Sequence, residues 1–115
     1  MPETHAKQVG DARTASDSRA FLLGFLKKFP GFAASELYIA GESYAGHYVP
    51  TLAAAILDGN AAAAAAGSTA GHLNLQGVLV GNAWTDAPTD NYGAVRGGVA
   101  ACCARAGASG YVAAR

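Results

Sequence analysis

The sequence has no excess of charge of either sign and no long apolar run, and these two absences exclude broad classes of function. Eight Lys and Arg residues balance eight Asp and Glu residues, so the formal net charge is zero. No basic cluster is present to neutralise phosphates, which leaves nucleic-acid binding unsupported. No apolar run reaches the roughly 20 residues of a membrane span, and the N-terminus shows no signal-peptide pattern. We therefore expect neither a nucleic-acid partner nor a membrane partner.

Cysteine is equally scarce, and the two cysteines are adjacent at Cys102 and Cys103. Neighbouring cysteines pair with each other only under strain, so they do not identify the redox compartment. A metal site would need further ligands at suitable spacing, and the sequence does not offer them. We expect neither a metal nor a cofactor.

Alanine inflates the hydrophobic content, which is 51% of the residues. Residues 61–66 are an uninterrupted alanine run, and small residues continue to Gly71. Such residues offer little area to bury. We interpret the segment near 61–71 as a low-complexity surface insert, although the helix propensity of alanine could instead extend the preceding helix.

The rest of the chain predicts the order helix, strand, helix, strand, and hence two parallel strands in an α/β fold. The first helix, 15–29, has a cap at Thr14 or Ser16 and a stop at Pro30. Its apolar stripe, which we expect to cover a sheet, consists of Phe21, Leu22, Phe25, Leu26 and Phe29. The other elements are a strand at 36–40, a helix from 44 to about 57 ended by the turn residues 58–60, and a strand at about 75–80.

A serine stands where the first strand meets the second helix. A chain that turns this sharply forces Ser43 into a strained conformation with an exposed hydroxyl, and it tolerates only small neighbours. Gly41 meets that need on one side and Ala45 with Gly46 on the other, a slight departure from the G-x-S-x-G pattern. The Tyr44 backbone N–H then points toward a developing oxyanion. The alternative is that Ser43 merely caps the helix.

Residues 38–50 closely resemble the nucleophile segment of the serine carboxypeptidases, which include the plant serine carboxypeptidase-like proteins. The flanking segments 10–30 and 74–95 resemble that family too. The resemblance implies an α/β-hydrolase fold, of which residues 1–95 would be a central fragment with an incomplete sheet. Residues 96–115 form a divergent Gly/Ala/Arg-rich tail that we expect to be poorly ordered. Complete family members are secreted or vacuolar.

The resemblance also implies roles for three residues. Ser43 would be the acylated nucleophile that removes C-terminal residues from peptides, and Tyr44 would donate one oxyanion-hole N–H. Glu42 would help to bind the substrate's C-terminal carboxylate, which requires a proton shared between the two carboxyl groups. A solvated residue at a turn is the alternative for Glu42. The same fold also supports an acyltransferase, and a non-catalytic remnant is a third possibility.

The sequence does not identify a base for Ser43. The family's catalytic Asp and His follow the serine far downstream, and no position of this chain matches them. His5 lies in a polar segment and His72 in a glycine-rich loop. His47 shares a helix face with Ser43, but that helix runs away from the hydroxyl, so we expect a packed, hydrogen-bonded histidine.

Two carboxylates follow the second strand, on the side where α/β sheets gather their ligands. Turn chemistry explains Asp86 and Asp90 as well, and we favour that structural interpretation. Trp84 and Tyr92 are expected to be packing residues.

Overall fold

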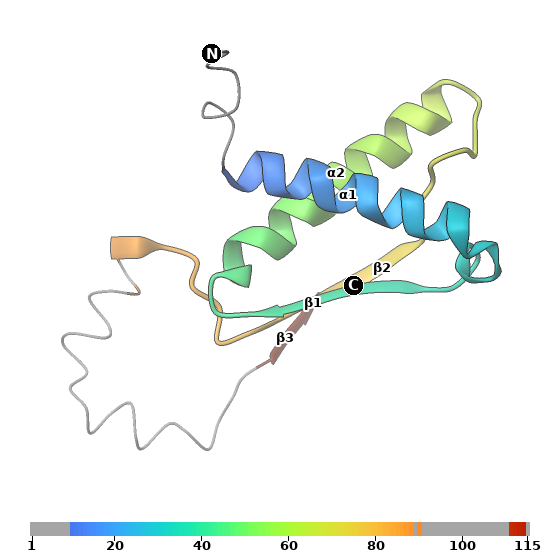
Figure 1. The fold of residues 1–115 in the computed structure, drawn as a ribbon. Helices are drawn as coiled ribbons and strands as arrows, with labels where there is room; N and C mark the ends of the chain where they lie inside the picture. Colours follow the sequence, from blue (N-terminus) through green and yellow to red (C-terminus); the bar gives the residue numbers. More distant parts are fainter. Residues whose placement is uncertain (1–9, 89, 91–110, 115) are drawn as a thin grey trace, which may run out of the picture.

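Two helices and two parallel strands form the body of the protein (Figure 1). The structure, a computed structural model, describes residues 10–88, 90 and 111–114. In chain order its elements are α1 (Asp11–Lys28), the 3₁₀ helix η1 (Pro30–Phe32), β1 (Leu37–Glu42), α2 (Ala45–Ala65), β2 (Leu75–Gly81) and β3 (Tyr111–Ala114). The predicted order of helix, strand, helix and strand in an α/β arrangement is confirmed.

The sheet has the strand order β1-β2-β3. As predicted, β1 and β2 are parallel, and their register pairs Glu42 with Gly81, so that both strands end level with each other. β3 pairs antiparallel with β2 and was not predicted. It lies in the tail that we expected to be poorly ordered; residues 96–110 and 115 of that tail are outside the described residues.

Helix α1 begins about one turn earlier than predicted. Its N-cap is Gly10, and the hydroxyl of Thr14 donates to the Gly10 carbonyl oxygen at 3.2 Å. The expected cap at Thr14 or Ser16 is therefore wrong, because both residues lie inside the helix. The predicted stop is correct: α1 ends at Lys28, and Pro30 opens η1.

Helix α2 runs through residues 58–60, where we predicted its end, and continues to Ala65. The Asn60 amide makes tertiary contacts instead of ending the helix. Its nitrogen donates to the Leu73 carbonyl at 2.8 Å, and its oxygen accepts the Leu73 N–H at 2.9 Å. The alanines that follow have the highest helix propensity and extend α2. Residues 61–65 therefore extend the preceding helix, which was the second of the two interpretations of the alanine-rich segment.

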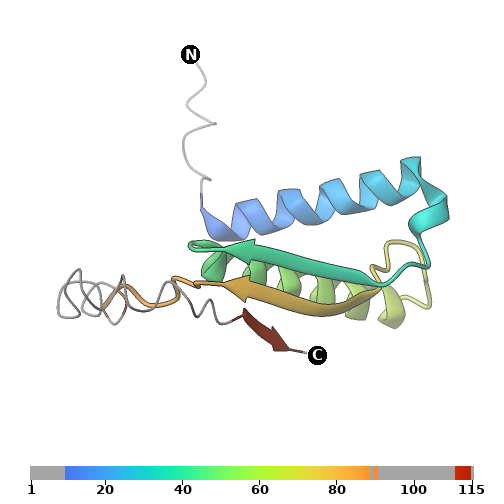
Figure 2. The same ribbon diagram turned by 90° about the horizontal axis from the view of Figure 1, so that it is seen from below.

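Both helices lie on one side of the sheet, and Figure 2 shows α2 behind β1 and β2. Helix α1 packs on α2, so the expectation that its stripe covers the sheet is wrong. Phe21, Phe25 and Phe29 are 69%, 38% and 43% exposed, and they contact one another along the helix. No described helix is both long and apolar enough to cross a membrane. The buried apolar residues of the described chain are Ala15, Val49, Ile56 and Leu73.

Candidate active site

Ser43 lies between the end of β1 and the start of α2. Figure 1 shows that the chain turns sharply between these two elements. The φ of Ser43, 58°, is in the left-handed region, which residues other than glycine rarely adopt. The residue is exposed. The predicted strained turn with an exposed serine is therefore confirmed. The capping alternative is wrong, because Tyr44 occupies the N-cap position and no side chain caps the helix.

Two glycines allow the close packing that this turn requires. A Cβ atom at Gly41 would overlap the Cβ of Ala45 and lie 3.2 Å from Cγ2 of Val49. A Cβ atom at Gly46 would overlap the carbonyl oxygen of Trp84. The small residues on either side of the serine are thus required by steric contact, as the sequence indicated.

Backbone hydrogen bonds fix Ser43 from both sides. Its N–H donates to the Gly81 carbonyl at 3.1 Å, at the end of β2. Its carbonyl accepts the Trp84 N–H at 2.8 Å and the Gly46 N–H at 3.0 Å. Within residues 10–88, the Tyr44 N–H donates to no backbone carbonyl.

An aromatic cluster surrounds the first turn of α2. The Tyr44 and Trp84 rings are stacked with centroids 5.3 Å apart and planes at 23°. The His47 ring lies 4.8 Å from Tyr44 and 5.2 Å from Trp84, and Tyr48 lies 4.9 Å from Tyr44. His47 and Trp84 are packed, as predicted. We also expected His47 to be hydrogen-bonded, but its buried Nε2 has no partner among the described residues.

Asp90 holds the loop that follows β2. Its Oδ2 accepts the backbone N–H groups of Thr85 at 2.7 Å and Asp86 at 2.9 Å. The hydrogen bond from Asp86, then that from Thr85, lowers the pKa of the Asp90 carboxyl. Nearer the serine, desolvation and then the Asp11 carboxylate raise the pKa of the Tyr44 phenol. Asp90 itself has helical backbone, and its carboxylate binds backbone N–H groups that precede it, which agrees with the structural interpretation of this residue.

The structure brings some candidate residues to the carboxyl ends of the strands and leaves others away from them. Glu42 is the last residue of β1 and is exposed next to Ser43. His72 precedes the start of β2, at the opposite end of the sheet. Among the described residues, no histidine hydrogen-bonds to the Ser43 hydroxyl, and no three potential metal ligands gather. His5, Tyr92, Cys102 and Cys103 lie outside the described residues.

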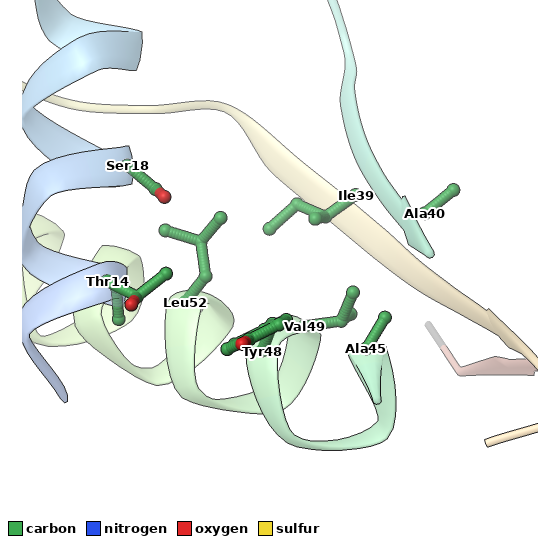
Figure 3. Close-up of a pocket in the computed structure, with 9 residues that line it drawn as sticks. Thr14, Ser18, Ile39, Ala40, Ala45, Tyr48, Val49 and Leu52 are labelled. Atoms are coloured by element: carbon green, nitrogen blue, oxygen red, sulfur yellow. The ribbon is translucent and has the colours of Figure 1, made fainter. Parts of the chain in front are cut away.

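A hollow of about 250 Å³ lies between α1, β1 and α2 (Figure 3). Its walls are mostly apolar, and Thr14 and Ser18 of α1 add two hydroxyls. Ala45 and Tyr48 of α2 also line it, but Ser43 does not. The hollow therefore lies next to the serine turn without including the serine.

Sequence reasoning treated Trp84 as a packing residue but did not place it against the serine turn. The available signal was Gly46, since a glycine in the first turn of a helix can mark a close backbone approach. The sequence could not say which segment approaches.

Comparison with known proteins shows the family of the chain. The sequence model of the serine carboxypeptidase family matches residues 2–105, and the chain belongs to that family. This match is wider at both ends than the resemblance over residues 10–95. Serine carboxypeptidase-like 25 of Arabidopsis thaliana is 50% identical over 87 residues, which are 76% of this chain and 17% of that protein.

Two other Arabidopsis thaliana proteins, serine carboxypeptidase-like 35 and serine carboxypeptidase 24, are each 49% identical over 89 residues. Each alignment covers 77% of this chain and 18% of the relative. The chain thus spans less than a fifth of the length of these relatives.

Proposed function

We propose that this chain supplies the nucleophile of a serine-type carboxypeptidase, which removes C-terminal residues from peptides through an acyl-enzyme on Ser43. The hydroxyl oxygen attacks the carbonyl carbon of the last peptide bond and gives its proton to a base. The C-terminal residue leaves as the amine, and water then hydrolyses the ester. The observation that carries the proposal is the left-handed φ of Ser43, 58°, at an exposed turn between a strand and a helix.

The Tyr44 N–H completes the nucleophile's half of the site. It follows Ser43 directly and donates to no backbone carbonyl in the described range 10–88. A preorganised donor of this kind stabilises the oxyanion of the tetrahedral intermediate, and the loss of one such donor lowers kcat by about 10²–10³. Neither described histidine is hydrogen-bonded to the serine. We therefore propose that the base is the catalytic His of the family, oriented by its Asp.

Glu42 favours a peptide C-terminus as the substrate. Its side chain is exposed at the end of β1, adjacent to the nucleophile. A carboxyl group in this place can bind a substrate carboxylate through one shared proton, because two ionised carboxylates would repel each other. We therefore expect substrate binding to weaken as pH rises, and Glu42→Gln to reduce that dependence while kcat changes less than KM.

A hybrid enzyme tests the proposal. The aligned 89-residue segment of Arabidopsis thaliana serine carboxypeptidase 24 is replaced by that of this chain, and release of the C-terminal residue from an N-blocked dipeptide is measured. We expect activity in the hybrid, loss to background in Ser43→Ala, and no loss in Ser16→Ala, an exposed serine of α1. A hybrid that is folded but inactive, or one in which Ser43→Ala stays active, contradicts the proposal.

The acyltransferase differs only in the acceptor, which is an alcohol instead of water. Methanol added to the same assay partitions the acyl-enzyme between the acid and the ester. Hydrolysis as the main product in dilute alcohol supports the peptidase, and ester as the main product contradicts it.

A further inference from the structure

The peptide unit between Ser43 and Tyr44 carries two functional groups on opposite sides. Its carbonyl belongs to Ser43, and its N–H is the donor that we assign to the oxyanion hole. A peptide unit is planar, and in the trans form its C=O and N–H point in opposite directions. Whatever holds the Ser43 carbonyl therefore also sets the direction of the Tyr44 N–H.

Two backbone N–H groups hold that carbonyl, that of Gly46 in α2 at 3.0 Å and that of Trp84 in the loop after β2. The Trp84 N–H donates to the Ser43 oxygen at 2.8 Å, the shortest hydrogen bond at this turn. The indole ring of Trp84 stacks on the Tyr44 ring, with centroids 5.3 Å apart, and also packs against His47 at 5.2 Å. Its carbonyl oxygen occupies the space left by the missing side chain of Gly46. Trp84 thus contacts four of the five residues from 43 to 47.

The loop that carries Trp84 is itself held at both ends. Before it, Gly81 ends β2 and accepts the Ser43 N–H at 3.1 Å. After it, the Asp90 carboxylate accepts the N–H groups of Thr85 and Asp86. The loop that carries the Trp84 N–H is therefore held by hydrogen bonds on both sides of that residue.

We propose that Trp84 is a positioning residue of the oxyanion hole, which orients and polarises the Tyr44 N–H through the Ser43 carbonyl. The inference rests on the proposed function of Ser43 and Tyr44. Hydrogen bonds accepted by a carbonyl polarise the peptide unit and strengthen its N–H as a donor. The stacked ring keeps the Trp84 N–H in place, so truncating the ring disturbs the donor although the backbone N–H remains.

The first test uses the chain itself and amide hydrogen exchange by NMR. We expect the amide of residue 84 to be protected in the wild type and in Trp84→Phe, which keeps a stacked ring. In Trp84→Ala and in Gly46→Ala, protection of that amide should fall by about tenfold or more, because the local hydrogen bond opens. Gly24→Ala is the matched control, since a Cβ there meets nothing within 4 Å. An unprotected amide in the wild type, or full protection in Trp84→Ala, overturns the proposal.

The second test uses the hybrid enzyme and separates kcat from KM. Because misplacement of a catalytic group by about 1 Å can cost about 10²-fold, we expect Trp84→Ala to lower kcat by about 10- to 100-fold. KM should stay within about twofold, because the oxyanion contact forms in the transition state. Trp84→Phe should restore most of kcat. Unchanged kcat in Trp84→Ala, or a loss that Trp84→Phe does not restore, overturns the proposal.

The two tests fail differently. If the unmodified hybrid is folded but inactive, the proposed function is wrong, and amide exchange in the chain alone still decides whether Trp84 positions the peptide unit. If the hybrid is active and Ser43→Ala abolishes activity, but the Trp84 variants behave as wild type, only the positioning role is wrong.

Discussion

A single methyl group added at Gly41 should destabilise the protein, because the serine turn leaves no room for it. The new Cβ would overlap the Ala45 Cβ, below the 3.0 Å that real Cβ atoms keep, and would lie 3.2 Å from Cγ2 of Val49. Overpacking of this kind costs about 1–3 kcal/mol. Replacing glycine also restricts the unfolded chain, which stabilises the folded state by about 0.4–1 kcal/mol. The net expectation is a loss of about 1–2 kcal/mol in the free energy of unfolding.

The assay is urea unfolding followed by fluorescence of Trp84, the only tryptophan in the chain, with TMAO added to strengthen burial. Gly24→Ala is the control: it adds the same methyl group in open space on α1 and should stabilise by up to about 1 kcal/mol. The double variant Gly41→Ala/Ala45→Gly should be more stable than the summed losses of its two single variants, because it removes the overlapping atom. A Gly41→Ala midpoint equal to that of the wild type, or additive losses in the double variant, would refute the steric account of the turn.

Two further predictions concern the side chains that hold the loops. Asn60→Ala should lower the free energy of unfolding by about 2 kcal/mol. It leaves the backbone N–H of buried Leu73 without a partner, and the Leu73 carbonyl keeps the Leu75 N–H as a donor. Urea midpoints equal to the wild type would contradict this. The pKa of Asp90 is lowered in the folded protein, so its carboxylate stabilises the fold at pH values above the unfolded pKa, near 3.8. This stabilisation is lost as the pH falls through the pKa of the folded protein. Trp84 fluorescence should therefore change in acid in the wild type and change less in Asp90→Asn. The same pH dependence of fluorescence in both proteins would contradict the role of the Asp90 carboxylate in holding this loop.

The serine turn could be predicted from sequence because its causes are local. A short apolar strand, a serine and small neighbours at 41, 45 and 46 stand within a few residues of one another, and the structure shows the strained φ and the close contacts that they imply. The parallel pairing of β1 and β2 followed from the order of elements alone.

The features that sequence reasoning missed depend on contacts between distant residues. The approach of Trp84 to Ser43 joins two loops, and nothing in either segment specifies the partner. Helix α2 passes residues 58–60 because the Asn60 side chain binds Leu73, thirteen positions further on, instead of capping the helix. The periodicity of the α1 stripe indicated a buried face but could not say that α1 packs on α2 rather than on the sheet.

The most direct test of the central claim is the site of covalent modification by a fluorophosphonate in the hybrid enzyme. Intact-mass analysis and peptide mapping should show one adduct, on the oxygen of Ser43, which disappears in Ser43→Ala and persists in Ser16→Ala. The reagent requires an activated serine, because an ordinary hydroxyl is a weak nucleophile at neutral pH. An adduct on any other residue, or an unmodified Ser43 in a hybrid that hydrolyses peptides, would contradict the assignment of this serine as the nucleophile.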